Sequence, residues 1–322
     1  MRGVEVRPLE AGDLDEAGRL LAVRHQKHRK AQPLLSPSYE DPATARAEIE
    51  RAWQTEGASG AVAEANGRLT GFLLGAPKTS PVWGPNVWVE SAGLATEDAE
   101  TMRDLYAVAA ARWADEGRTA HYVLVPAHDT VLLDAWYRLG FGQQHAHGLT
   151  VVPKTPPQPP ATVTIRRAER RDIDVLAQLE VELPLHQGLS PVFSAGTMPD
   201  LEESKAEWEN DIDDDEYGSF VAEVDGRVVG SAVGCALEKS SSHTGLNRPD
   251  NAGVLGFAAV LPQARGAGAG RALGEAVGWW VAQRGFGSYA TDWRVTNLLS
   301  SRTWPRLGFE TTFLRLHRVL GY

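Results

Sequence analysis

The feature that most constrains the fold of this chain is an apolar strand that leads through a glycine-rich turn directly into a helix. The expected strand covers residues 254–261 and the expected helix covers 271–284. Between Arg265 and Arg271, every second residue is glycine. Glycine lets a backbone approach a ligand closely, and a helix start adds unpaired N–H groups and a positive dipole end. The pattern predicts a diphosphate site flanked by two arginines.

The turn differs from both common nucleotide-binding loops, because it lacks a Gly-Lys-Ser/Thr ending and Gly-x-Gly-x-x-Gly spacing. It matches Arg-x-x-Gly-x-Gly at Arg265, Gly268 and Gly270. A second motif follows one helix and one strand later: Asn297 after a strand, then an aromatic-x-x-x-Gly-Phe ending at Trp304. In this order the motifs resemble the acetyl-CoA motifs of the GNAT superfamily of N-acetyltransferases, over roughly residues 163–322. The alternative for the turn is a flexible run of small residues.

The resemblance implies a mixed, mostly antiparallel sheet flanked by helices and splayed between its fourth and fifth strands. Acetyl-CoA would lie in that wedge. Backbone N–H groups late on the fourth strand would hold the thioester and pantetheine, the turn would hold the diphosphate, and Asn297 would contact the pantetheine arm or cap a helix. The implied cofactor-binding residues are Ala258, Ala259, Val260, Arg265, Gly266, Ala267, Gly268, Ala269, Gly270, Arg271, Asn297, Ser300 and Trp304.

An internal repeat extends the expected fold to the whole chain. Asn66-Gly67 and Asp225-Gly226 are hairpin signals between alternating strands, and they lie 159 residues apart. The Trp136 and Trp304 motifs lie 168 apart, so the second copy has nine extra residues, most of them expected near 240–245. We therefore predict an α/β (α+β) protein of two tandem GNAT-like domains, 1–152 and 163–322, joined by a Pro-rich linker over 153–162.

The first copy is expected to lack a working cofactor loop. With the offset of 168, Glu97, Asp98, Glu100 and Met102 stand where the second copy has Arg265 and glycines. Carboxylates repel a diphosphate, although they suit a helix start. The first domain is therefore interpreted as degenerate, kept for structure or for shaping the substrate cleft. It is expected to pack on the second domain through an apolar surface that draws on Trp53, Trp83, Trp88, Trp113 and Trp136.

The catalytic acid and base are harder to assign. In the family a tyrosine often stands four residues before the glycine of the Gly-Phe ending, where this chain has Trp304. An indole N–H does not release its proton usefully. The remaining candidates for the catalytic acid are Ser300, Ser301, His317 and water. Asp292 at the end of a strand is the first choice of base, with Asp250 or a water chain as alternatives.

Other reactive or charged side chains have plainer explanations. The single Cys235 is expected in the core, and His145 and His147, two apart on a strand, lack a third ligand for a metal. The acidic run 211–216 is expected to be a solvated helix end, with attraction of a cationic amine as the alternative. Three aromatic residues are expected in the core rather than at an acceptor site: Trp208, Phe193 and Tyr217.

Composition sets the remaining limits. A net charge of −10 over 322 residues argues against a nucleic-acid or anionic-membrane partner. No 18-residue apolar run or signal-peptide core is visible, so a cytoplasmic protein is expected. We also expect a monomer or homodimer that holds no metal.

The sequence thus predicts an acetyl-CoA-dependent N-acetyltransferase acting on a small primary amine, with its cofactor site in the C-terminal domain. Two alternatives remain open: a noncatalytic acyl-CoA-binding regulatory module, and a protein or peptide N-acetyltransferase.

Overall fold

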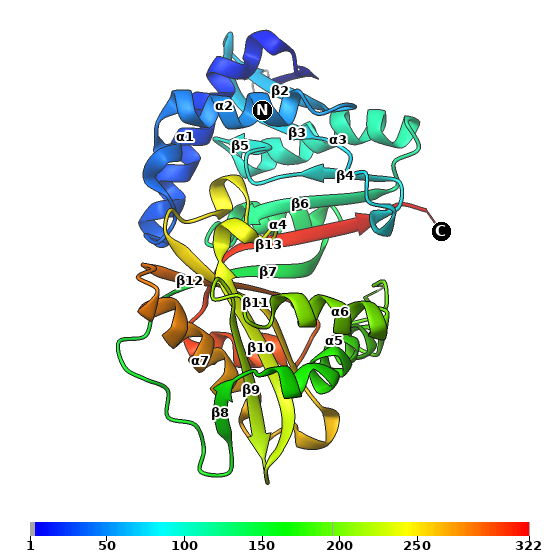
Figure 1. Cartoon of the computed structure of the whole chain (residues 1–322). Coiled ribbons are helices and arrows are strands. Elements are labelled where there is room, and N and C mark those ends of the chain that lie inside the picture. The colour runs from blue at the N-terminus through cyan, green and yellow to red at the C-terminus, as the bar shows by residue number, and fades with distance from the viewer. Residues whose placement is uncertain (1–3, 195, 322) are drawn as a thin grey trace. The chain divides into compact units, whose positions relative to one another are not determined.

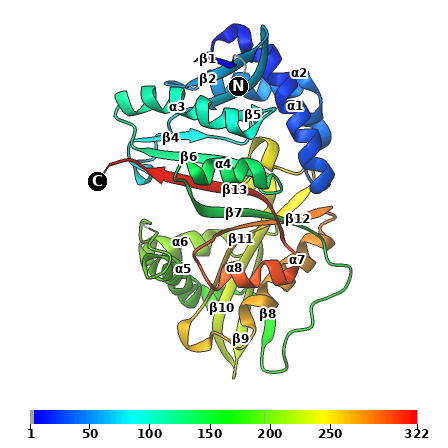
Figure 2. The same cartoon turned by 180° about the vertical axis from the view of Figure 1, so that it is seen from behind.

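The structure is a computed structural model that describes residues 4–194 and 196–321. The chain divides into two compact units, and neither unit is continuous in sequence. The first unit comprises the chain up to Ala146, Thr244–Asp250 and the chain from Thr311 on. The second unit comprises His147–His243 and Asn251–Glu310. Figures 1 and 2 show two opposite views of the chain.

The first unit contains two sheets. One has the order β1-β2-β3-β5, and in the other β4, β6 and β13 are neighbours. β6 pairs parallel with β4 and antiparallel with β13. The elements are β1 (Val4–Pro8), α1 (Leu14–Ala31), α2 (Pro42–Trp53), β2 (Ser59–Ala65), β3 (Arg68–Gly75), β4 (Asn86–Val89), β5 (Leu94–Thr96), α3 (Ala99–Asp115), β6 (Ala120–Pro126), α4 (Thr130–Arg138), the first part of β7 (Gly142–Val151) and nearly all of β13 (Glu310–Val319).

The second unit holds a sheet in the order β12-β11-β10-β9-β8. All of these neighbours are antiparallel except β11 and β12, which are parallel. The elements are β8 (Thr164–Arg167), α5 (Ile173–Gly188), α6 (Leu201–Asp211), β9 (Gly218–Val224), β10 (Arg227–Ala236), β11 (Ala252–Val260), α7 (Ala269–Gln283), β12 (Ser288–Arg294) and α8 (Ser300–Thr303).

The predicted repeat and α/β class are confirmed by the element order. Each half runs through strand, two helices, two hairpin strands, a fourth strand, helix, strand, helix and closing strand, the fourth strand being split into β4 and β5 in the first half. Asn66-Gly67 and Asp225-Gly226 all have positive φ, as a two-residue type I′ turn requires.

An ion cluster is also duplicated at the start of each half. Arg7 bonds Asp13 and Glu64 in the first half, and Arg166 bonds Asp172 and Glu223 in the second. Asp13 and Asp172 directly precede α1 and α5, but their side chains do not cap these helices. Instead their carboxylates accept from arginine and from the N–H three residues earlier, within a 3₁₀ turn. Neither carboxylate is left for a helix cap, because the arginine and the turn use its oxygens.

The last strand of each half does not follow the predicted domain boundaries, which divided the chain into two continuous segments. β7 begins in the first compact unit and passes into the second at His147, while β13 lies in the first unit from Thr311 on. The segment 244–250 also belongs to the first unit, although it lies between β10 and β11 in sequence. Most of the nine extra residues precede β11, since the starts of β11 and β4 differ by 166 positions rather than 159.

Buried tryptophans contribute to the core of each unit. Trp88, Trp113 and Trp136 are buried in the first unit, so these three serve its own core. Trp208 is buried with Leu176 and neighbouring apolar residues of the second unit, as the sequence predicts. Within residues 4–194 and 196–321, we find no helix long and apolar enough to cross a membrane.

Candidate active site

The sheet of the second unit opens between its fourth and fifth strands. β11 and β12 pair from Ala252↔Ser288 to Leu255↔Thr291, and the ladder ends there. β11 continues to Val260 on its other side, paired with β10. The last five residues of β11 therefore have an open edge that faces a wedge in the sheet, as the resemblance implied.

Only alternate residues of β11 direct their N–H groups into this wedge. The N–H of Leu261 donates to the carbonyl of Val229 on the β10 side, at 2.8 Å. Because hydrogen bonding alternates along an antiparallel strand, Ala259 also faces β10, whereas Ala258 and Val260 face the open edge. Of the three expected backbone donors, the geometry leaves Ala258 and Val260 for a ligand and commits Ala259 to the sheet.

The glycine turn presents an uncapped helix start beside this edge. Gly266 and Gly268 have φ of 88° and 89°, a conformation that favours glycine. Gly268 is the N-cap of α7, so no side chain bonds the first-turn N–H groups of Ala269, Gly270 and Arg271. The first turn also carries no acidic residue. Unpaired N–H groups together with the helix dipole make this an anion-binding geometry.

A chain of hydrogen bonds links the two sequence motifs. Arg265 donates from Nε to the carbonyl of Val260, at 3.2 Å, and from Nη1 to Nδ1 of His186, at 3.4 Å. His186 Nε2 lies 3.2 Å from Oδ1 of Asn297. Arginine can only donate, so Nδ1 accepts and the ring carries its proton on Nε2, which donates to Asn297. His186 is a site residue that the sequence analysis missed, since a lone histidine late in α5 gives no signal of its partners.

Asn297 is buried and shapes the start of α8. Its Oδ1 also accepts from the N–H of Leu299, at 3.1 Å, while Ser300 Oγ donates to the Asn297 carbonyl, at 3.4 Å. The N-cap residue of α8 is Leu299, which has no side-chain cap, so Asn297 is not the helix cap that the sequence suggested. The Asn297 side chain instead orders the turn before α8 and also bonds His186.

Trp304 packs rather than facing solvent. It is buried, its ring lies 6.5 Å from that of Phe309, and a Cβ added at Gly274 of α7 would lie 3.1 Å from its Cζ3. Gly308, with φ 89°, ends the turn after α8. These contacts fit a residue that sets the spacing of α7 and α8.

Asp292 lies at the apex of the wedge. It is the first residue of β12 beyond the last ladder pair, Leu255↔Thr291, and it is partly exposed. Asp250, the alternative base, and His317, one of the candidate acids, belong to the first compact unit. Asp292 remains the predicted base on position alone.

The remaining sequence candidates are placed as follows. Cys235 is buried in β10, and burial raises the pKa of its thiol, in keeping with a core residue. His147 contacts the ring of His243 edge-on, at 5.0 Å. Across the described parts of the chain there is no group of three or more His, Cys, Asp or Glu residues arranged to hold a metal.

The acidic run after α6 is exposed and partly paired. Asp213 bonds Arg170, and Glu216 pairs with Lys239, which also lies over the ring of Tyr217 at 4.7 Å. Phe193 is 73% exposed, so the expectation that it lies in the core is wrong. It stands in the segment between α5 and α6.

Comparison with known proteins agrees with this geometry. Residues 184–309 match the sequence model of the acetyltransferase (GNAT) family, so this part of the chain is a GNAT domain and the predicted resemblance is confirmed. A search of curated proteins found no match.

Solved structures extend the fold likeness to the whole chain. A GCN5-related N-acetyltransferase from Sphaerobacter thermophilus is 15% identical, with 99% of this chain and 97% of that chain covered and a TM-score of 0.58. The glucosamine N-acetyltransferase region of a fungal multi-domain β-N-acetylglucosaminidase is 14% identical, with coverages of 98% and 38% and a TM-score of 0.53. At these identities the likeness concerns the fold.

Proposed function

We propose that the protein is an acetyl-CoA-dependent N-acetyltransferase of a small primary amine, with its cofactor site in the second half of the chain. One observation carries the proposal: within a GNAT domain, the open edge of β11 runs directly into the uncapped start of α7. A thioester arm on the edge and a diphosphate on the helix start would use both sets of unpaired N–H groups.

The residues would divide the work as follows. The N–H groups of Ala258 and Val260 would hold the pantetheine and the thioester oxygen, where negative charge develops as the amine attacks. The N–H groups of Gly268 to Arg271 would hold the diphosphate. Arg265 would leave the Val260 carbonyl to make room for the arm, since both occupy the same edge.

Acetyl transfer requires two proton movements. The amine nitrogen forms a bond to the acetyl carbon and loses a proton, while the C–S bond breaks and the thiolate of CoA gains one. Asp292 at the wedge apex is our candidate to accept the amine proton. Water would protonate the thiolate, because tryptophan stands at the position where a tyrosine acid is often found.

The test combines binding with turnover. Calorimetry should give one acetyl-CoA site per chain, and a panel of small primary amines should release free CoA, followed with a thiol reagent. Cys235 is buried, so the folded protein adds little background to that reading. Failure of acetyl-CoA to bind would refute the proposal.

The noncatalytic alternative rests on Trp304 and on the absence of a carboxylate along β11. It predicts binding of acetyl-CoA without release of CoA for any amine. Basic peptides in the same panel test the peptide alternative. A cytoplasmic, metal-free monomer or homodimer stays our expectation for the protein.

A further inference from the structure

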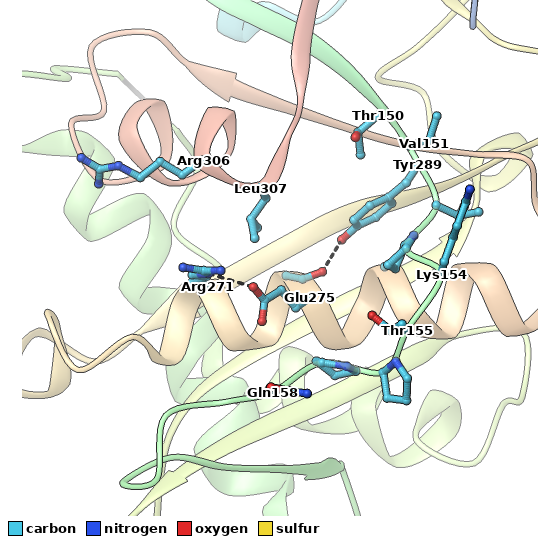
Figure 3. Close-up of a pocket in the computed structure, with 16 residues that line it drawn as sticks. Thr150, Val151, Lys154, Thr155, Gln158, Arg271, Glu275, Tyr289, Arg306 and Leu307 are labelled. Carbon is cyan, nitrogen blue, oxygen red and sulfur yellow. Dashed lines mark hydrogen bonds and ion pairs between the residues drawn. The ribbon is translucent and has the colours of Figure 1, made fainter.

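β7 and β12 are neighbours in the sheet of the second unit, and they run in opposite directions. A Cβ added at Gly148 of β7 would lie 2.7 Å from Cζ3 of Trp293, near the end of β12. Further along β7, Thr150 and Val151 line one pocket with Tyr289, near the start of β12 (Figure 3). The part of β7 in this unit is therefore antiparallel to β12.

The internal repeat indicates the register of these two strands. β12 lies 168 positions after β6, and β7 lies 168 positions before β13, with the same lengths. β6 and β13 pair antiparallel, with Leu124 opposite Arg315. The residues at the same offset are Asp292 of β12 and His147 of β7, so the repeat places these two opposite each other. Side chains at opposite positions have Cβ atoms about 5 Å apart.

This carboxylate and imidazole lie where the proposed reaction needs a proton acceptor. Asp292 is the first residue of β12 beyond the ladder with β11, and it is partly exposed. β12 lies between β11 and β7, so His147, which is buried, meets Asp292 from the side opposite the wedge. An amine that reaches Asp292 from the wedge therefore does not touch His147.

A serine–histidine cluster supports the ring of His147. The ring of His243 contacts it edge-on, with the centroids 5.0 Å apart. His243 is fully buried, and its Nδ1 lies 2.9 Å from Oγ of Ser242, which lies 2.9 Å from Oγ of Ser240. These three residues belong to the loop between β10 and β11, where the second half carries most of its extra residues. The longer loop thus holds the imidazole that faces Asp292.

We propose that His147 is a positioning residue of the acetyl transfer and acts through Asp292. As the amine nitrogen bonds the acetyl carbon, its proton moves to a carboxylate oxygen of Asp292 and on to a ring nitrogen of His147. An imidazole holds a proton near neutral pH, and an ordinary carboxylate does not. Asp292 thereby recovers its charge, and the imidazole gives the proton to water before the next turnover. The inference rests on the proposed function and deepens it, because it makes the base a carboxylate–imidazole pair.

A double-mutant cycle on the full chain tests the pair, with release of CoA as the reading. Asp292→Asn and His147→Gln should each lower kcat by about 100-fold, with KM for acetyl-CoA within about twofold. Because the two side chains act as one unit, the double variant should lose no more than about threefold beyond either single variant. Losses that multiply to about 10⁴-fold would show independent roles and overturn the inference.

His145→Gln is the matched control, because His145 is also a buried histidine of β7. It should retain kcat within about threefold, the range of a packing change that leaves the reacting groups in place. A loss as large as that of His147→Gln would assign the effect to the packing of β7 and overturn the inference.

Chemical rescue separates proton transfer from packing. His147→Ala leaves space for free imidazole, so added imidazole should raise its kcat by at least about tenfold, and it should leave His147→Gln unchanged because the glutamine fills that space. No rescue of a His147→Ala variant that circular dichroism shows to be folded would overturn the inference.

A milder variant tests the support of the ring. Ser242→Ala should lower kcat about two- to fivefold, since His243 loses one hydrogen bond, and Ser241→Ala, at an exposed position, is its control. Equal kcat in these two variants would overturn the role of the cluster. Failure of the wild type to release CoA with any amine would instead refute the proposed function.

Discussion

The two helices that follow the fourth strands start in opposite ways. α7 begins after Gly268, which has no side chain to cap it. α3 begins after Asp98, whose carboxylate accepts the N–H of Glu100 at 3.0 Å, and Glu97 beside it pairs with Arg68. A carboxylate at a helix start occupies one of its N–H donors and repels a second anion there. The same fold position is thus open in one half and closed in the other.

The structure also corrects how the two loops align. The N-caps Asp98 and Gly268 differ by 170 positions, whereas the flanking strands β6 and β12 differ by 168. Asp98, rather than Glu100, is therefore the counterpart of Gly268. The offset of 168 was measured on the Trp136 and Trp304 motifs, so it missed that the turns before α3 and α7 differ in length by two residues.

The fourth strands differ as well. β11 is continuous, while its counterpart is broken into β4 and β5 around residues 90–93. The buried guanidinium of Arg24 donates to the carbonyls of Ser91 and Leu94 at this break. The first half has thus filled the region that stays open in the second with its own side chains.

The largest expected effect comes from removing the first half. A fragment from Ala161 to Tyr322 should be insoluble or inactive, because β13 would lose its partner β6 and the second unit would lose its part of β7. Coexpression with residues 1–160 should restore soluble, active protein. A fully active lone fragment would show the halves to be independent, and the comparison between them would lose its meaning.

The second largest effect is expected when the carboxylate that caps α3 is introduced at the start of α7. Gly268→Asp should weaken acetyl-CoA binding by at least about 100-fold, since a carboxylate within about 4 Å of a diphosphate costs several kcal/mol. Gly268→Asn is the matched control, because asparagine tolerates the same positive φ without charge. Equal losses in both variants, measured by calorimetry, would assign the effect to backbone strain.

The folding stability of the first half should be sensitive to acid. Burial lowers the pKa of His25 to about 4 and that of His28 to about 2, against 6.5 for a free histidine. Below pH 6.5 the unfolded chain binds protons that the folded chain does not, so stability falls as pH falls from 6.5 toward 4. At pH 4.5 the loss is up to about 5 kcal/mol for the pair.

Denaturant unfolding at pH 7.5 and 4.5 measures this loss, and hydrogen exchange along α1 locates it. His25→Gln with His28→Gln retains amide donors for the carbonyls of Ser36 and Thr312 and should flatten the pH dependence. A double variant as acid-sensitive as the wild type would assign the effect to other groups.

A smaller effect is expected where the two motifs meet in the second half. His186→Leu should raise KM for acetyl-CoA about three- to tenfold with kcat within about twofold, because Arg265 and Asn297 each lose one hydrogen bond. Glutamine can both donate and accept, so His186→Gln should restore most of the affinity. A fall in kcat with KM unchanged would make His186 part of the chemistry instead.

Local patterns predicted the fold well. Asn66-Gly67 and Asp225-Gly226 demand a particular turn, and alternating strands beside them have one buried face, so the repeat could be read from the sequence. The division of β7 between the two compact units, and the place of β13 in the first, could not be predicted from the sequence. The pattern of a strand shows that one face is buried, but it does not show which sheet buries that face.

The candidate site was predictable where it is built from backbone. Glycines with positive φ leave a sequence signature, so the tight turn at Gly266 and Gly268 could be predicted. The contact of His186 with Arg265 depends on how α5 meets the wedge, 79 positions away in sequence. A single imidazole has no periodicity, and its role becomes visible only once the fold brings its partners to it.

The smallest effect is expected at the paired tryptophans. Trp136 is fully buried against Phe141 in the first half, and Trp304 packs on Gly274 and Phe309 in the second. If both are packing residues, Trp304→Phe should retain kcat within about fivefold, and both it and Trp136→Phe should lower stability by about 1 to 2 kcal/mol. Steady-state kinetics and denaturant unfolding measure the two quantities. A loss above about 100-fold in kcat with KM unchanged is the size expected for a positioned proton donor, and it would mean that the two tryptophans, alike in sequence, have diverged into a structural residue and a catalytic one.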